Sequence, residues 1–470
     1  MRLSDLLVAL ELLSRHDVND ALDQQSRSGR PLGDVLVEMG LLDASTIADL
    51  QDGLPAPPES IAQLGIEPRI VLDMLVKYLS NTGQGSTASI AETLAISRRL
   101  ATVLIETARA QGVVELKPGI VAGELRVDLT PRGRSMAVEA FANSAYIGPL
   151  PVSLDEYSRR VLRQTIGGEV VTAQAVASAM QPLVVEELLL AKVGIAANAG
   201  RSILLYGAPG NGKTSIAERM VKAFGAMVLV PHCFEVSGQI VKVFDPSVHR
   251  RLGAGGGRGT STSLFADEFD PRWVACRRPF VSAGGELSLD MLDLKFEETA
   301  RFYEAPLHVK AMNGVLLIDD FGRQLARPEA LLNRWVVPMD RRIDFLKLHT
   351  GQSFQIPFDQ LLVFSTNLSP RDLMDPAFLR RLPYKIHVHG PNTADFALLL
   401  RTKAEEHGID YPEAAIVYTI EAIKKHGTPL AFYQASEIPQ QIADLCNFLD
   451  RPMQANESTI RFALGNLLVD

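Results

Sequence analysis

The stretch from Gly207 to Thr214, GAPGNGKT, restricts the fold more than any other part of the chain. It satisfies the pattern GxxxxGK[ST], follows the apolar run SILLY and precedes the helix-like run SIAERMVKAF. Glycines let backbone N–H groups surround phosphate oxygens, and the N-terminus of the following helix adds its positive dipole. The sequence therefore predicts a P-loop between a strand and a helix of a parallel α/β sheet.

Each part of this loop has an expected task. We expect Lys213 to reach the β- and γ-phosphates of ATP, and the hydroxyl of Thr214 to bind Mg²⁺. The complete set of predicted nucleotide-binding residues is Gly207, Ala208, Pro209, Gly210, Asn211, Gly212, Lys213 and Thr214.

Two carboxylates follow the apolar run GVLLI in the segment GVLLIDDFGR, residues 314–323. A buried strand that ends in acidic residues is costly unless those residues meet a cation or water. We expect Asp319 to associate with Mg²⁺ and Asp320 to polarise the attacking water. Taken alone, the same pair is also compatible with a strand end where Asp only caps a helix.

Polar residues follow another apolar run, LLVFST, and a pair of arginines comes soon afterwards. Asn367 is placed to orient water or touch the γ-phosphate, although by itself a Thr-Asn turn is the simpler interpretation. In DPAFLRRLPYKIHV, Arg380 and Arg381 are by themselves typical of solvated charge at a helix end.

In this order, these motifs resemble those of the AAA+ ATPases over residues 181–470. The resemblance implies that Asn367 is the sensor 1 residue, and that Arg381, with Arg380 as second candidate, is an arginine finger. Such a finger acts on ATP in the adjacent subunit, which implies a homo-oligomeric ring, commonly a hexamer. The chain has Asp320 where most members have Glu, as in helicase loaders and initiators. No arginine occurs between Arg401 and Arg451, so no sensor 2 residue is assigned.

The remaining pattern of this region completes the predicted core. Four apolar runs, SILLY, AMVLVP, GVLLID and LLVFST, are expected to be strands buried on both faces of the parallel sheet. DFLKLHTGQSFQIPF is expected to be a hairpin, and the chain after about residue 393 is expected to be a helical lid. A glycine-rich insertion at residues 250–263 lacks P-loop spacing.

An internal repeat occupies residues 1–57, since RLSDLLVALELL aligns with PLGDVLVEMGLL, and Asp43 is expected to cap the last helix. It resembles the N-terminal domain of type II secretion and type IV pilus assembly ATPases, some of which bind cyclic di-GMP. Several motif positions are replaced, with Ser4 and Glu11 for glycines and Pro31 for arginine. Protein docking is therefore favoured over binding of the dinucleotide.

Residues 65–150 contain three helical periods followed by an alternating run, the order of a winged-helix module. We expect Arg98 and Arg99 on its recognition helix and Arg126, Arg132 and Arg134 in its wing. Nine Lys or Arg against eight Asp or Glu leave this segment nearly neutral, which favours protein contact over DNA binding. The predicted domains are thus residues 1–57, 65–150, a helical connector at 151–190, the nucleotide-binding domain at 191–393 and the lid at 394–470.

Composition limits the class of protein. A net charge of −8 provides no bulk attraction to nucleic acid or anionic membrane, and no apolar run is long enough to span a bilayer. The three widely spaced cysteines form no metal motif, so a cytoplasmic protein with reduced thiols is expected.

The predicted function is an oligomeric AAA+ ATPase that uses ATP and Mg²⁺ to remodel a protein client, as chaperone-type members do. A link to secretion or pilus machinery rests on the N-terminal repeat. The alternatives are a nucleic-acid-handling initiator, loader or regulator, and a receptor for cyclic di-GMP in which ATP binding is secondary.

Overall fold

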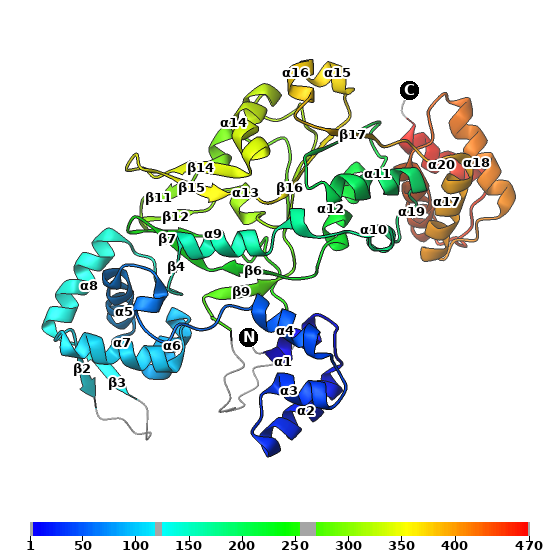
Figure 1. Cartoon of the computed structure of the whole chain (residues 1–470). Coiled ribbons are helices and arrows are strands. Elements are labelled where there is room, and N and C mark those ends of the chain that lie inside the picture. The colour runs from blue at the N-terminus through cyan, green and yellow to red at the C-terminus, as the bar shows by residue number, and fades with distance from the viewer. Residues whose placement is uncertain (1–2, 118–124, 254–268, 469–470) are drawn as a thin grey trace.

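The computed structural model describes residues 3–117, 125–253 and 269–468. Most of the predicted glycine-rich insertion, residues 118–124 of the alternating run predicted within 65–150, and Arg2 at the start of the repeat lie outside these ranges. The described chain is a mixed α/β structure built around a parallel sheet (Figure 1).

Five parallel strands form the central sheet in the order β10-β13-β16-β5-β17. Their bounds are β5 Ile203–Tyr206, β10 Phe280–Ala283, β13 Val315–Ile318, β16 Leu361–Thr366 and β17 Tyr384–His387. Alternate residues of these strands enter two different cores, so the sheet is covered on both faces. This burial explains why β5, β13 and β16 have continuous apolar sequences instead of an alternating pattern.

Helices from different parts of the chain cover the two faces. One face packs against α10 (Ala173–Met180), α11 (Glu187–Asn198) and α12 (Lys213–Met220). The other packs against α14 (Pro328–Arg341), whose Trp335 is completely buried. The short elements of this region are η2 Ile166–Gly168, η3 Val221–Ala223, η4 Leu289–Leu292, α13 Leu307–Lys310, α15 Pro370–Leu373 and α16 Pro376–Leu379.

The prediction that the run AMVLVP belongs to the parallel sheet is wrong. The run AMVLVP forms β6 (Val228–Pro231), which pairs antiparallel with β9 (Trp273–Cys276) outside that sheet. All four residues of β6 are buried, mostly in a core separate from those of the parallel sheet. Burial therefore explains the apolar sequence of β6 as it does for the strands of the parallel sheet. The strand beside β13 is instead β10.

A second sheet is formed mainly by the long segment between the P-loop and Asp319. Its strand order is β11-β12-β8-β7-β4, with bounds β4 Val152–Ser153, β7 Cys233–Val236, β8 Gln239–Lys242, β11 Lys295–Glu297 and β12 Phe302–Glu304. Helix α9 (Leu154–Arg163) follows β4 directly and contacts β7. The hairpin predicted before β16 is present as β14 (Ile343–Lys347) and β15 (Ser353–Pro357).

The N-terminal repeat is visible in the local structure. Its helices are α1 Leu3–Ala9, α2 Arg15–Ser28, α3 Leu32–Glu38 and α4 Ala44–Gly53. Glu11 and Gly40 occupy equivalent positions and both have positive φ, 59° and 68°. Ser14 caps α2 through the backbone N–H of Asp17, and Asp43 caps α4 through that of Thr46, as predicted. The repeat therefore needs a left-handed residue after each short helix, which glycine supplies without strain.

The next unit combines four helices with a small antiparallel sheet of order β1-β3-β2. Its elements are η1 Ala62–Leu64, α5 Pro68–Thr82, β1 Gly85–Ser86, α6 Thr87–Leu94, α7 Arg98–Ala110, β2 Val114–Lys117, β3 Arg126–Leu129 and α8 Pro131–Asn143. Two of the predicted wing arginines are misplaced, because Thr130 caps α8 and carries Arg132 and Arg134 into that helix. Arg126 lies in β3, and Arg98 and Arg99 lie at the start of α7, as expected.

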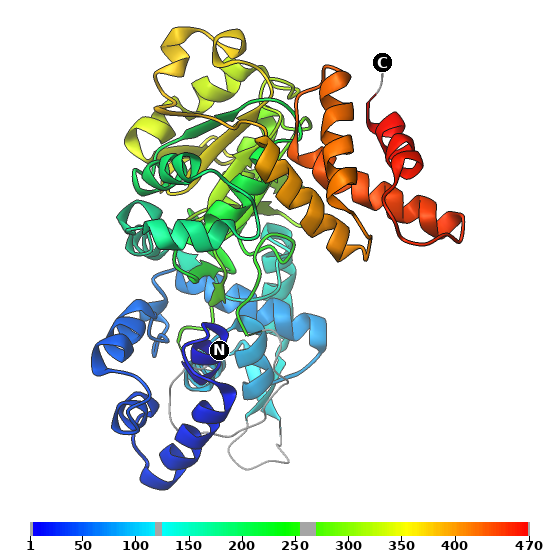
Figure 2. The same cartoon turned by 90° about the vertical axis from the view of Figure 1, so that its right-hand side faces the viewer.

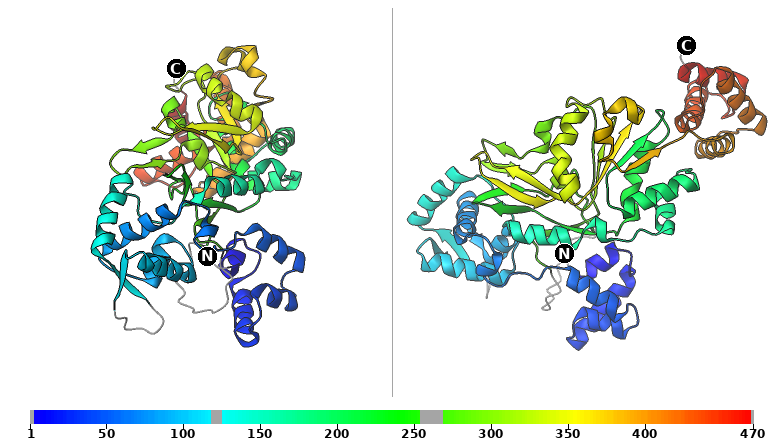
Figure 3. Two further views of the ribbon diagram at one scale, coloured as in Figure 1. Left: turned by 60° about the vertical axis from the view of Figure 1, so that its left-hand side comes forward. Right: turned by 45° about the horizontal axis from the view of Figure 1, so that its top comes forward.

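The regular elements of the C-terminal region, from Thr393 to the last described residue, are all helices. They are α17 Thr393–Glu406, α18 Glu413–Lys425, α19 Phe432–Phe448 and α20 Glu457–Leu467, and they share a core of their own. Figures 1 and 3 show these helices at one end of the molecule and the unit of α5–α8 toward the other. Figure 2 shows both N-terminal units on the same side of the parallel sheet.

Candidate functional site

Three strands of the parallel sheet end at one edge and carry the predicted site residues. Tyr206 of β5 is paired with Thr366 of β16, and Ile318 of β13 is paired with Phe364. The residues that follow these strands are the P-loop, Asn367 and Asp319. Because parallel strands present their carboxyl ends together, segments that are remote in sequence meet here.

Lys213 is the first residue of α12 and is 7% exposed. Its Nζ donates to the carbonyl oxygens of Gly207 and Ala208, both at 2.9 Å, and to Oδ1 of Asn367 at 2.7 Å. Burial lowers the pKa of Lys213, although Asp319 and Asp320 partly counteract this effect. The ammonium group thus lies inside the loop, bonded to neutral oxygens that a phosphate can replace.

Thr214 and Asp319 form the second contact of the site. The hydroxyl of Thr214 donates to Oδ2 of Asp319 at 2.7 Å. The backbone of Asp319 is fixed on both sides, since its N–H donates to Ala283 and its carbonyl accepts from Gln324 at 2.6 Å. A hydroxyl and a carboxylate at this separation are hard oxygen donors of the kind that Mg²⁺ prefers, so the residues fit that ion.

Asp320 and Asn367 complete a chain of polar contacts. Nδ2 of Asn367 lies 3.3 Å from Oδ1 of Asp320, while its Oδ1 accepts from Lys213. Asp320 is exposed and has φ of 48°, a left-handed conformation that is uncommon for residues other than glycine. Backbone outliers of this sort recur at functional sites.

Sequence reasoning missed the residues that hold this strand edge together. The buried hydroxyl of Thr366 donates to the carbonyl of Phe321 at 2.7 Å, and the N–H of Phe321 donates to Ser365 at 2.7 Å. Gln324 belongs to the same support. Nothing in the sequence distinguishes these residues from ordinary turn residues, because the contacts that reveal their role join segments remote in sequence.

A cavity of about 710 Å³ adjoins the P-loop and was also missed. It lies between residues 182–192, which precede and begin α11, the segment 387–392 at and after the end of β17, and the start of α19. Tyr433 closes one side, since its N–H donates to the carbonyl of Gly210 at 3.1 Å. A Cβ on Gly210 would lie 2.1 Å from the Tyr433 ring, so only glycine fits. Asn211 is buried there and its Oδ1 has no partner among the described residues.

Arg380 and Arg381 do not join the other predicted site residues. They precede β17, whose first residue, Tyr384, is paired with Ile203 at the start of β5. The P-loop follows the other end of β5, about 13 Å away for four strand residues. The two arginines therefore lie at the opposite edge of the sheet from the P-loop of the same chain.

The three cysteines are buried and free, and burial raises the pKa of Cys233 and of Cys276 to about 12. Within the described ranges, no cluster of three or more His, Cys, Asp or Glu side chains is arranged to hold a metal ion. Nor do those ranges contain a helix with the length and hydropathy needed to cross a bilayer.

Comparison with known proteins gives one partial match to a family and several distant structural neighbours. A family model described as a domain of unknown function (DUF8689) matches residues 392–466, which correspond to the C-terminal helices. A search of the curated proteins finds no match.

Among solved structures, the chain is similar to a mutant of RuvB from Thermotoga maritima, with 13% identity over 62% of this chain and 73% of RuvB and a TM-score of 0.37. It is also similar to NtrX from Brucella abortus, with 13% identity over 63% of this chain and 58% of NtrX and a TM-score of 0.39. NtrX in complex with ATP gives 13% identity, covers 66% and 60% of the two chains, and has a TM-score of 0.38. Scores of this size express distant likeness alone.

Proposed function

We propose that this chain is an ATP-hydrolysing P-loop enzyme of the AAA+ type. The observation that carries the proposal is the polar chain at the carboxyl edge of the sheet, Thr214–Asp319 and Lys213–Asn367–Asp320. These five residues come from three separate motifs, and their chemistry covers phosphate binding, cation binding and water activation in one place.

The proposed reaction uses each group in turn. The loop amides and Lys213 hold the β- and γ-phosphates of ATP, which replace the neutral oxygens now bonded to Nζ. Thr214 and Asp319 hold Mg²⁺, which when bound offsets phosphate charge. Asp320 accepts a proton from a water molecule while that water's oxygen attacks the γ-phosphorus. The bond between the γ-phosphorus and the bridging oxygen of ADP breaks, which releases ADP and phosphate. Asn367 lies between Asp320 and Lys213 and keeps these two side chains apart.

The cavity next to the P-loop is a candidate site for the nucleoside part of ATP. It begins at the P-loop residues Gly210 and Asn211 and is lined by apolar residues of 182–189 as well as by His387 and Tyr433. An aromatic base with polar edges suits such a site, which combines apolar walls with a few polar groups. We propose that the base and ribose of ATP occupy this cavity and that α19 closes over it.

We further propose that the subunits assemble into a ring in which Arg381, or Arg380 beside it, acts on ATP held by a neighbour. The support is the location of both arginines at the sheet edge remote from their own P-loop. A group that serves its own site would be expected at the other edge.

A protein client is the proposed object of the ATP-driven motion. The contacts of two arginines in residues 65–150 support protein contact over DNA binding, because Arg134 donates to the carbonyl of Leu129 at 2.8 Å and Arg99 pairs with Glu59 at 3.5 Å. For residues 1–57, Glu11 at a motif glycine position favours a docking role over cyclic di-GMP. A connection with secretion or pilus machinery is part of the same proposal.

The decisive experiment compares ATP binding and hydrolysis in three variants. Lys213→Ala should weaken ATP binding by about 100-fold or more, because each lost hydrogen bond to charge is worth ~1.5–3 kcal/mol. Asp320→Asn should retain binding and lose about 10²–10⁴ in turnover, the usual contribution of a general base. Lys222→Ala, an exposed lysine beyond the same helix, should change neither.

Normal ATP affinity in Lys213→Ala would exclude the P-loop as the nucleotide site. Undiminished turnover in Asp320→Asn would assign water activation to another residue. The same Asp320→Asn variant, loaded with ATP, is the reagent for affinity capture of the client; duplex DNA and cyclic di-GMP serve as alternative ligands in filter binding.

A further inference from the structure

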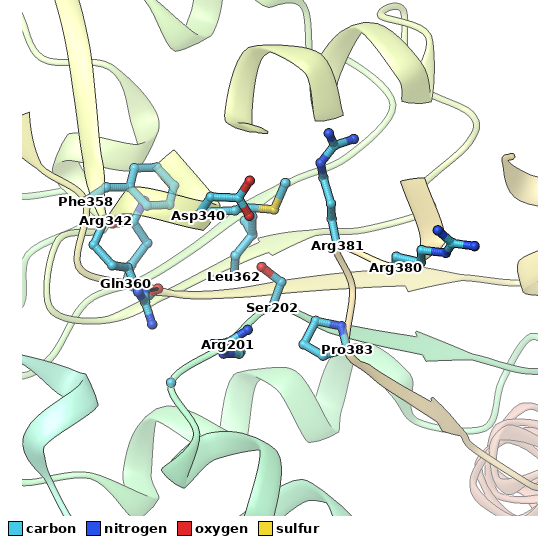
Figure 4. Close-up of a pocket in the computed structure, with 12 residues that line it drawn as sticks. Arg201, Ser202, Asp340, Arg342, Phe358, Gln360, Leu362, Arg380, Arg381 and Pro383 are labelled. Carbon is cyan, nitrogen blue, oxygen red and sulfur yellow. Dashed lines mark hydrogen bonds between the residues drawn. The ribbon is translucent and has the colours of Figure 1, made fainter. Parts of the chain in front are cut away.

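A second cavity, of about 290 Å³, opens at the amino edge of the parallel sheet (Figure 4). It is lined by the residues that lead into β5, by the end of α14, and by the segments that precede β16 and β17. Four arginines line it against one carboxylate: Arg201, Arg342, Arg380 and Arg381 against Asp340. This edge is opposite the P-loop, so the cavity is separate from the nucleotide site of the same chain.

Gln360 is the unusual member of the lining. Its side chain is 1% exposed, yet neither Nε2 nor Oε1 has a hydrogen-bond partner among the described residues. An unpaired buried amide costs free energy that an apolar residue would avoid. In Figure 4, Gln360 lies beside Arg342 and near Arg201, whereas the guanidinium groups of Arg380 and Arg381 point away from Gln360.

Two of the four arginines, Arg201 and Arg342, lack a direct salt bridge within the described residues. Neither of them forms an ion pair there, and the side chain of Arg342 donates only a long hydrogen bond, 3.4 Å, to the backbone carbonyl of Gln360. Arg342 approaches closely because Gly200 has no side chain: a Cβ there would lie 3.1 Å from Nη2 of Arg342. Burial and the nearby Arg201 lower the pKa of Arg342, while Asp359 counteracts them.

Helices α11 and α14 end close to this cavity, and the carbonyl groups at helix C-termini stabilise nearby cations. That effect accounts for arginines at this edge. It does not account for an enclosed neutral amide with both polar atoms unused, which needs a ligand that accepts one hydrogen bond and donates another.

We propose that this cavity is a binding site for hydrogen phosphate. The oxyanion would accept hydrogen bonds from Arg201, Arg342 and the hydroxyl of Ser202, as well as from Nε2 of Gln360. Its remaining P–OH would donate to Oε1 of Gln360 or to the carboxylate of Asp340. Sulfate has the same shape but carries no proton at neutral pH. It would therefore place an anionic oxygen against Oε1 of Gln360 or the carboxylate of Asp340, where hydrogen phosphate donates a hydrogen bond.

The test is calorimetric titration of the full chain carrying Lys213→Ala, which weakens phosphate binding at the P-loop. Inorganic phosphate should bind with a stoichiometry near one. Sulfate should bind at least about tenfold more weakly, because one hydrogen bond is replaced by repulsion between two oxygen atoms. O-phosphoserine at pH 8, which has lost the P–OH proton, should also bind more weakly than inorganic phosphate. The proposal does not depend on hydrolysis, because no nucleotide is present.

Two further substitutions in that background locate the site. Gln360→Leu and Arg201→Ala should each lower phosphate affinity about tenfold or more, while Arg341→Ala, an exposed arginine outside the cavity, should leave it unchanged. Gln360→Leu should unfold at no lower temperature than its parent, because the lost amide has no partner. If that variant fails to fold, Arg201→Ala decides, since Arg201 is exposed.

Absence of phosphate binding, equal affinity for phosphate and sulfate, or undiminished binding in the folded Gln360→Leu or Arg201→Ala variant would each overturn the proposal.

Discussion

The side-chain amide of Asn367 connects two charged residues of the site, a role that the sequence around it does not indicate. Next to Thr366 it is typical of a turn. In the structure its carbonyl oxygen faces the Lys213 ammonium at 2.7 Å and its amide nitrogen faces the Asp320 carboxylate at 3.3 Å. The opposite charges of these neighbours determine which end of the amide points to which. A carboxylate or an aliphatic side chain at this position would satisfy only one of them or neither.

Asn367→Ala should therefore impair turnover more than ATP binding. Losing hydrogen bonds to charged groups worth ~1.5–3 kcal/mol corresponds to about a 10–100-fold lower kcat, whereas the loop amides and Lys213 still hold the phosphates. Steady-state hydrolysis and equilibrium ATP binding measure the two effects. Asn333→Ala, an exposed residue of α14, is the matched control. A larger loss of affinity than of kcat would assign Asn367 to nucleotide binding alone.

At the scale of elements, the sequence predicts the strands that carry the site better than it predicts their neighbours. The strands β5, β13 and β16 are each apolar and followed by chemically distinctive residues. β6 was expected in the parallel sheet but lies outside it, and β10, which the sequence did not single out, pairs with β13 instead, because apolar content indicates burial and not which sheet buries a strand. Arg132 and Arg134 are misplaced for a local reason, since Thr130 and Pro131 begin a helix where alternation suggested a strand.

Neither cavity could be predicted from the sequence, for a different reason. They are lined by segments from several elements, so no sequence window contains either of them. The prediction of helices after about residue 393 covers one wall of the larger cavity, but it does not identify Tyr433 of α19 as the residue that contacts Gly210.

Helix α5 carries a buried lysine that makes the stability of its unit depend on pH. Lys77 is 2% exposed, donates to the carbonyl of Ser144 at 3.0 Å, and has its pKa lowered to about 8 by burial. Between about pH 8 and 10.5 the unfolded state holds a proton that the folded state has released, so this group makes stability rise with pH.

Lys77→Met should remove that rise. The difference in free energy of unfolding between wild type and Lys77→Met should move in favour of wild type by up to about 3 kcal/mol from pH 7 to pH 10. Pulse proteolysis in urea, with fragments of the α5–α8 unit identified by mass, measures it. The exposed Lys425→Met should give a difference that does not change with pH. A constant difference for Lys77→Met would contradict the lowered pKa.

At the scale of the whole molecule, the separation of the two sheet edges makes the assembly testable. If Arg381 completes the site of a neighbour, Arg381→Ala should keep ATP affinity and lose about 10³–10⁵ in turnover. An arginine that only pairs with a surface carboxylate would matter by ~1 kcal/mol or less.

Mixing Arg381→Ala with Asp320→Asn, each inactive alone, should restore part of the hydrolysis, because some interfaces then combine an intact carboxylate with an intact arginine. Subunit exchange is verified in parallel with labelled chains. A mixture that exchanges but stays inactive would contradict action between subunits, and normal turnover of Arg381→Ala would reduce that residue to surface charge.

The position of β5 inside the parallel sheet has a consequence for how the protein is made. Its two neighbours, β16 and β17, are both translated long after it, at residues 361–366 and 384–387. A nascent chain therefore carries the P-loop on a strand with neither edge paired until the ribosome has passed β16. The α5–α8 unit has most of its core within residues 64–150 and can be compact by then. Nucleotide binding should accordingly appear late in synthesis, and a chain that stops before β17 should not acquire it.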